Sequence, residues 1–235
     1  MDAKLNTERN HAFVVRLADL KKLWDLLQSR IGAVTISAKC GDKIERTFDN
    51  YKQLKGFENS PQKRVVHLSL NSRSDDWKKT AQIDFSDSPY RVIDIRLSGS
   101  EQLISRLHDD IIDILDGTRP WYSRLSKIDF FYVISFLVWP AFAIANILQP
   151  ENSNPPKVEL TIELTLIIVA VVTVASALII MLAWLLNKFR ARFFPIATFA
   201  IGQGEERYRT DDKIRWTILI GFLVSLSASL VVAAL

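Results

Sequence analysis

The chain contains a single cysteine and three histidines among its 235 residues. One cysteine cannot form an internal disulfide or a cysteine-cluster metal site, and Cys40 is compatible with a reducing compartment. The histidines show no ligand-like spacing, so we expect surface or boundary residues at His11, His67 and His108. The sequence therefore predicts no metal ion and no cofactor.

Sequence signatures of catalysis are also missing. The chain has no nucleophile elbow, P-loop, zinc-protease motif or paired-carboxylate signature. The pattern Gly202-Gln203-Gly204 indicates a sharp turn rather than a phosphate site. We expect no strand of a crossover unit before it, and no further glycine follows at the required spacing. These absences predict a protein that is not an enzyme.

Acidic and basic residues nearly balance in the first half of the chain. Residues 1–118 hold 19 lysines and arginines against 18 aspartates and glutamates, and the remainder holds 11 against 8. The formal net charge of +4 is therefore not concentrated in one domain, as it would be in a nucleic-acid-binding protein. We expect no nucleic acid as a partner.

Three long apolar stretches predict an all-α transmembrane region over 128–235. The first, 128–148, has one charge at its edge, Asp129, and the others cover about 164–186 and 214–235. At 1.5 Å per residue, about 20 helical residues cross a hydrocarbon core that is about 30 Å thick. We therefore expect three transmembrane helices in a lipid bilayer.

Flanking charges predict the orientation of these helices, because lysine and arginine are retained on the cytoplasmic side. The segment 119–127 and the loop 188–213 are basic, whereas the loop 149–163 has one lysine against three acids. We expect residues 1–118 in the cytosol and the C-terminus outside, in the cytoplasmic (inner) membrane. The first 30 residues are charged and periodic, unlike a signal peptide, so we expect no export by that route.

Two segments next to the apolar stretches have a basic and aromatic character. The juxtamembrane linker 119–127 carries Arg119, Trp121, Tyr122, Arg124 and Lys127. The loop 188–213 is apolar in its first half, which predicts an interfacial segment at headgroup level. Its expected interfacial residues are Phe189, Arg190, Arg192, Phe193, Phe194 and Phe199.

Small residues recur every four positions in the third apolar stretch, at Gly221, Ser225, Ser229 and Ala233. This spacing places them in one stripe along a helix, and such a stripe lets two helix backbones approach closely in lipid. The stripe predicts packing against another helix of the same chain or, alternatively, a homo-oligomer.

Residues 1–118 alternate as in a two-layer α+β domain. Period-two patterns predict strands, and helical patterns predict helices over 20–31 and 98–117, with Ser98 capping the second. The expected strands cover about 13–17, 34–39, 44–48, 66–70, 81–85 and 93–97. We expect a mainly antiparallel sheet with both helices on one face.

The domain is expected to present two polar surfaces. The uncovered sheet face would carry Thr35, Ser37, Lys39, Lys43, Glu45, His67, Ser69, Asn71, Gln82, Asp84, Arg91 or Arg96, and Asp94. The second helix has an acidic face, Asp109, Asp110, Asp113 and Asp116, in the half where the helix dipole disfavours negative charge. That face is either solvated or compensated by Arg119, Arg124 and Lys127 or by the basic loop.

The sequence favours a non-enzymatic membrane protein. Its cytosolic domain would bind a partner or another copy, and three transmembrane helices would anchor the assembly. One alternative is a membrane effector, as in bacterial defence or stress systems, whose sensor domain triggers oligomerisation and permeabilisation. Another is an accessory subunit of a larger membrane complex. The sequence indicates no particular small-molecule ligand.

Overall fold

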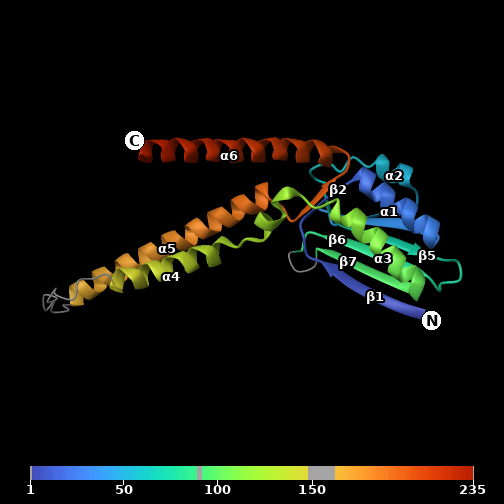
Figure 1. Ribbon diagram of the computed structural model, residues 1–235, viewed down its shortest axis with the longest axis horizontal. Helices are drawn as coiled ribbons and strands as arrows, with labels where there is room; N and C mark the ends of the chain where they lie inside the picture. The colour runs from blue at the N-terminus through green and yellow to red at the C-terminus, as the bar shows by residue number, and fades with distance from the viewer. Residues whose placement is uncertain (1, 89–91, 148–161, 235) are drawn as a thin grey trace. The chain divides into compact units, whose positions relative to one another are not determined.

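The computed structural model describes residues 2–88, 92–147 and 162–234. The chain forms two compact units, one of Met1–Ser126 with Phe193–Leu235 and the other of Lys127–Arg192. The first unit contains the expected α+β domain together with a segment that follows the second apolar stretch (Figure 1).

Six strands form the main sheet of the first unit. They are β1 (Asp2–Arg9), β3 (Ala33–Cys40), β4 (Glu45–Phe48), β5 (Val65–Arg73), β6 (Thr80–Ser86) and β7 (Ile93–Ser100). Their order across the sheet is β1-β7-β6-β5-β3-β4, and every neighbouring pair is antiparallel. The strand that comes first in the chain therefore lies at one edge of the sheet.

Two helices, α1 (Leu17–Arg30) and α3 (Glu101–Asp116), cover one face of this sheet (Figure 1). The strands alternate between buried apolar and more exposed polar residues, and the side chains of Ile36, Leu70 and Ile83 are completely buried. Such a pattern is expected of a sheet that is covered on one side. The predicted α+β class, with a mainly antiparallel sheet and helices on one face, is confirmed.

The edge strand β1 was not expected from the sequence. Leu5 is the only large apolar residue among its eight, so the strand lacks a clear hydrophobic alternation. Pairing with β7 is nevertheless continuous, from Asp2 opposite Ser100 to Arg9 opposite Ile93. The strand is held by this ladder and by Ala3 and Leu5, which pack against the core.

The short strand predicted near 13–17 forms β2 (Phe13–Arg16), but it does not join the main sheet. It pairs in parallel with β8 (Ala197–Ala200), which comes from the loop between the last two apolar helices. The Phe13 ring lies edge-on to Phe85, with centroids 5.3 Å apart, and to Phe199, with centroids 5.4 Å apart. This two-stranded ribbon is therefore part of the domain core.

The second helix begins later than predicted. Ser98 lies in β7, where it pairs with Lys4 and Thr80, and the cap of α3 is Ser100. The predicted capping box of Ser98 with Glu101 is therefore wrong. Ladder hydrogen bonds on both sides of β7 hold Ser98 in extended conformation and outweigh the local helix signal.

Three apolar helices follow the domain in the chain. They are α4 (Phe130–Ile147), α5 (Ile162–Phe193) and α6 (Gln203–Ala234). Two of them contain segments long and apolar enough to cross a membrane, Val169–Phe193 and Gln203–Ala233. In α4 the corresponding segment, Phe130–Pro140, is shorter than a span. Three transmembrane helices are therefore not confirmed, and the expected loop at 149–161 lies outside the described residues.

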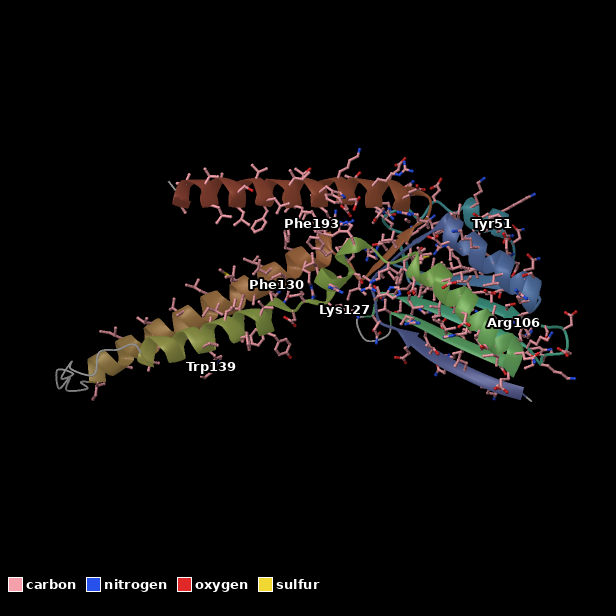
Figure 2. The ribbon with its side chains drawn as sticks, viewed as in Figure 1. Tyr51, Arg106, Lys127, Phe130, Trp139 and Phe193 are labelled. Carbon is pink, nitrogen blue, oxygen red and sulfur yellow. The ribbon has the colours of Figure 1, made fainter. Side chains whose placement is uncertain are left out.

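The two long apolar helices are not the buried core of a soluble fold. At most 6% of the most apolar window of either helix is buried. Figure 2 shows polar atoms concentrated on the α+β domain and mostly carbon along these helices. Because contiguous exposed apolar surface of this length is unfavourable in water, it indicates lipid around the helices.

Candidate functional site

One asparagine holds the β8 segment on the domain. Asn59 is 1% exposed, and its side-chain nitrogen donates to the carbonyls of Phe199, at 3.0 Å, and Ile201, at 3.2 Å. Its side-chain oxygen accepts from the Val65 amide at 2.9 Å, and its own carbonyl accepts from Arg207 at 2.7 Å. We call these contacts the Asn59 clasp. They join the loop before β5 to both ends of the β8–α6 connection.

Backbone geometry at this connection depends on glycine. Gly202 has a φ of +52°, and a Cβ there would lie 2.6 Å from the carbonyl oxygens of Phe57 and Glu58. Since both neighbours are backbone atoms, they cannot move aside as a flexible side chain would. The glycine therefore permits the close approach on which the Asn59 clasp depends.

The Gly202-Gln203-Gly204 pattern does follow a strand, β8, which the sequence did not predict. It also opens helix α6, an arrangement that can bind phosphate through free backbone amides. Here the amides of Gln203, Gly204 and Glu205 already donate to the carbonyls of Glu58, Ile201 and Gly202. The structure therefore gives this turn a packing role.

A buried arginine lies at the start of the apolar part of α6. Arg215 is 1% exposed, its Nε donates to the Phe193 carbonyl, and its guanidinium lies 3.3 Å from the Asp212 carboxylate. The guanidinium carbon is 4.5 Å from the ring centroid of Tyr122 and 5.3 Å from that of Tyr208. We call this cluster the Arg215 junction. A buried charge is stable only when paired and hydrogen-bonded, so α6 is fixed here in one position.

The juxtamembrane linker contributes to this junction. Residues Trp121–Lys127 form a 3-10 helix in which Tyr122 is completely buried, whereas Trp121 remains 46% exposed. Burial raises the pKa of Tyr122 to about 12, although the Arg215 charge opposes the shift. The Trp121 ring lies 5.5 Å from that of Trp216. Tyr122 is therefore a core residue of the domain, and the expected interfacial position is wrong for it.

The other basic residues of the linker remain exposed, as an interfacial linker requires. Arg119, Arg124 and Lys127 are all exposed. Whether these residues lie at a bilayer surface stays a prediction.

The loop 188–213 is largely folded onto the α+β domain. Phe199 is 6% exposed and belongs to the hydrophobic core, so its expected place at the membrane interface is wrong. The physical reason is pairing with β2, which turns Phe199 towards Phe13. Phe194 is partly buried and contacts the Tyr122 ring at 5.7 Å.

The residues at the end of α5 keep the character expected of an interfacial segment. Phe189 is 44% exposed, Arg190 donates to the Ile128 carbonyl, and Arg192 is exposed. Phe193 is partly buried, and its carbonyl is the acceptor at the Arg215 junction. Their place at the headgroup level stays a prediction.

The acidic face of α3 has partners other than those expected. Asp110 lies 3.7 Å from Arg30 of α1, and Asp116 lies 3.9 Å from His11. Asp109 lies 3.6 Å from the neighbouring His108, and Asp113 is exposed. Compensation therefore comes from α1 and from residue 11, because α1 packs beside α3, and the printed contacts do not involve Arg119, Arg124 or Lys127.

The small-residue stripe of α6 is exposed. Ser225, Ser229 and Ala233 are exposed, and a Cβ at Gly221 would meet nothing within 4 Å among the described atoms. The stripe is thus available for helix packing, and its predicted role in packing or oligomerisation stays a prediction.

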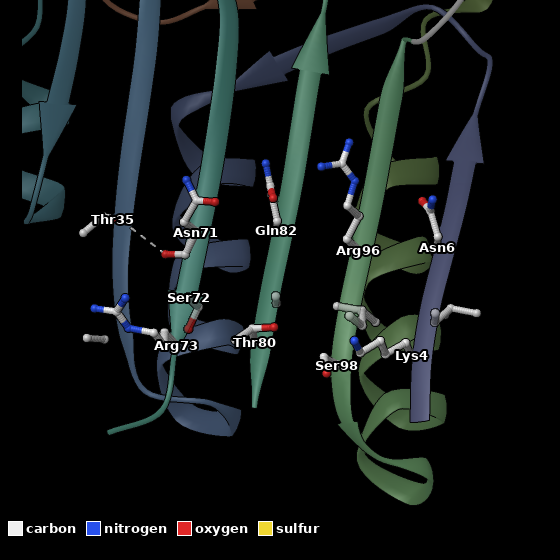
Figure 3. Close-up of a pocket in the computed structure, with 14 residues that line it drawn as sticks. Lys4, Asn6, Thr35, Asn71, Ser72, Arg73, Thr80, Gln82, Arg96 and Ser98 are labelled. Atoms are coloured by element: carbon white, nitrogen blue, oxygen red, sulfur yellow. Dashed lines mark hydrogen bonds between the residues drawn. The ribbon is translucent and has the colours of Figure 1, made fainter. Parts of the chain in front are cut away.

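The open sheet face carries polar side chains in rows across the strands (Figure 3). Facing residues in one row are Thr35, Asn71, Gln82, Arg96 and Asn6. This row lines a cavity of about 770 Å³, and the charged side chains around it are Lys4, Arg73 and Arg96. An adjacent row is acidic, with Asp84, Asp94 and Glu8 opposite one another.

The cavity and its acidic neighbours are linked by ion pairs. Arg96 pairs with Asp94, which is 5% exposed, and His67 lies 3.9 Å from Asp84. The polar character of this face agrees with the strand alternation, and Arg91 lies outside the described residues. The face offers hydrogen-bonding groups and both signs of charge to a partner.

Groups for catalysis or metal binding do not converge in the described part of the chain. No cluster of three or more His, Cys, Asp or Glu side chains there is placed to hold a metal ion. Cys40 is buried, and burial raises the pKa of its thiol, which disfavours the nucleophilic thiolate. Its position offers no support for a catalytic role.

Comparison with known proteins gives no relative. No family model, no curated protein and no solved structure matches this chain. The argument for function therefore depends on the Asn59 clasp, the Arg215 junction and the open sheet face.

Proposed function

We propose that this protein is a non-enzymatic membrane protein whose cytosolic α+β domain binds a partner or a second copy of the chain. In this proposal α4, α5 and α6 all span the cytoplasmic (inner) membrane, with the C-terminus outside. The exposed apolar surfaces of α5 and α6 support membrane insertion. The basic residues around them support a cytosolic domain.

The observation that carries the proposal is the inclusion of β8 in the domain. Residues 194–196 separate α5 from β8, and residues 201–202 separate β8 from α6. Because the Asn59 clasp and the Arg215 junction fix this segment, the domain is tied to the beginning of α6 by folded structure rather than by a loose linker. A partner that binds the domain is therefore mechanically connected to α6.

Topology tests the membrane part of the proposal. The full chain should stay in membranes washed with alkaline carbonate. Protease should digest the α+β domain in inverted vesicles and spare it in sealed right-side-out vesicles. Extraction by carbonate, or digestion in right-side-out vesicles, would contradict the proposal.

A membrane effector is the second candidate, and the unbroken course of α6 favours it. The helix continues from Gln203, beside the Asn59 clasp, through the Arg215 junction to Ala234. A rearrangement of the domain would move this helix as one rod. Overexpression with a membrane-potential dye separates the candidates: depolarisation supports the effector, and an unchanged potential supports the anchored binding protein.

A further inference from the structure

The free edge of β1 is a candidate interaction surface. This strand has eight residues, and its pairing with β7 shows no shift in register from Asp2 to Arg9. Within the described chain, no strand pairs with its other edge. The opposite edge of the sheet is the four-residue strand β4. β1 therefore offers the longer unpaired row of backbone donors and acceptors.

Natural edge strands are usually protected against pairing by proline, by a bulge or by being short. The sequence of β1 contains no proline, and its ladder contains no bulge. Its remaining protection is charge, and the charges alternate in sign. Charges of alternating sign repel a random partner but attract a strand with the complementary order.

The order of side chains on β1 is self-complementary. Lys4 and Asn6 line the cavity on the open sheet face, and Glu8 follows at the same spacing of two. In an antiparallel pair of two β1 strands related by a two-fold axis at Asn6, each Lys4 faces the Glu8 of the other copy. Asn6 then faces Asn6, and two opposite-charge pairs form across the new junction.

The neighbouring symmetric registers lack this match. A two-fold axis at Leu5 would place Asp2 opposite Glu8, which sets like charges against each other. An axis at Thr7 would place Glu8 opposite Asn6 and leave Lys4 beyond the strand, opposite Asn10. The charge pattern therefore favours one register.

We propose that two copies of this protein associate through antiparallel pairing of their β1 edges, with the two-fold axis at Asn6. This proposal rests on the proposed self-assembly of the cytosolic domain and names its interface. The pairing joins two six-stranded sheets into one continuous sheet. Both helix layers then lie on the same side, because an axis perpendicular to a sheet preserves its faces.

The helix-covered side of the strand is compatible with this pairing. Ala3 and Leu5 pack at the margin of the core, and both remain partly exposed. In the proposed register each Leu5 faces Thr7 of the other copy, so apolar surface at the margin becomes covered. The open faces of the two copies become one surface, with a cavity in each half.

Cysteine cross-linking tests the position of the axis. In Asn6→Cys, the two thiols would face each other, with Cα atoms about 4.5–5.5 Å apart, a separation that a disulfide spans. In the matched control Asn10→Cys, the two thiols would lie eight residues apart along the strands, about 27 Å. Native Cys40 is buried and remains in both variants.

The experiment uses the full chain in mild detergent and in membranes, with a soluble thiol oxidant. Asn6→Cys should give a covalent dimer rapidly, and Asn10→Cys should give little. Equal rates in the two variants would overturn the proposed interface. If native mass spectrometry then still shows a dimer, the proposed self-assembly stands and the interface lies elsewhere.

Charge reversal provides a second measurement that does not depend on cysteine. Lys4→Glu should weaken dimerisation by about tenfold or more, because two attractive pairs become two repulsive ones. Glu8→Lys should do the same. The double variant restores opposite charges across the axis, so it should recover most of the affinity. A double variant that dimerises more weakly than either single variant would contradict the register.

Discussion

Replacing Asn59 with alanine tests how the segment between the last two apolar helices is held. The substitution removes three side-chain hydrogen bonds and leaves the buried carbonyls of Phe199 and Ile201 and the amide of Val65 without those partners. Asn59 also has a positive φ of 49°, which asparagine tolerates better than alanine.

The expected loss follows from these contacts. A buried polar group that loses its partner costs about 1–3 kcal/mol, and a left-handed alanine costs about 1–2 kcal/mol more than glycine. Water can reach part of the opened site, so we expect a total of about 3 kcal/mol. At 1.4 kcal/mol per factor of ten, local opening of β8 should become about 100-fold more frequent.

Hydrogen exchange read by mass spectrometry measures this opening directly. Amides in the peptide covering 196–203 should exchange about 100-fold faster in Asn59→Ala, and the α1 peptide should change little. Asn71→Ala is the matched control, because Asn71 is only partly buried and its side chain donates one hydrogen bond, to Ser69.

Two results would refute the reasoning. Exchange at 196–203 that equals the wild-type rate would show that the Asn59 clasp does not hold β8. An equal effect in Asn71→Ala would show that the change is not specific to the clasp. Asn59→Gly separates the two contributions, since it loses the same hydrogen bonds without the left-handed strain.

Two further predictions concern the same region. The phenol of Tyr122 has its pKa raised from 10.0 to about 12 in the folded protein, so the stability that depends on the neutral ring is complete below pH 10 and falls by about 2–3 kcal/mol as the pH rises to 12. Unfolding between pH 9 and 12, with tyrosinate absorbance, should show this loss in the wild type and a smaller one in Tyr122→Phe. Gly202→Ala should lower thermal stability by about 2 kcal/mol or more, because its Cβ meets two carbonyl oxygens at 2.6 Å. Gly221→Ala is the control and should leave stability almost unchanged, since its Cβ meets nothing within 4 Å; equal melting temperatures for both variants would contradict the assigned packing role.

Local patterns predicted much of the α+β domain. Strands β3 to β7 and helix α1 have strong periodicity because each buries one face against a single large core. Such one-sided burial leaves a trace in every second or every third to fourth residue. The antiparallel sheet and its helix layer could therefore be predicted without knowledge of distant contacts.

Elements held by distant contacts were not predictable in this way. β8 has four residues, and its partner β2 lies more than 180 positions earlier in the chain. Its apolar residues resemble an interfacial segment when no partner is known. β1 is polar, and its conformation depends on β7.

The functional residues of the junction had similarly ambiguous signals. Arg215 belongs to a basic flank that is also typical of a transmembrane helix, and only the fold places Tyr122 and Tyr208 around it. Asn59 lies in a segment without periodicity. A polar residue that satisfies distant backbone groups leaves no local pattern in the sequence.

The origin of β8 has a consequence for biosynthesis. The ribosome makes residues 1–126 well before it makes 197–200, and both α4 and α5 come between. Until then Phe13 and Asn59 lack the partners that they have in the finished protein. The nascent domain must therefore wait, incomplete, while the intervening helices are translated, and its final folding step is timed by their synthesis.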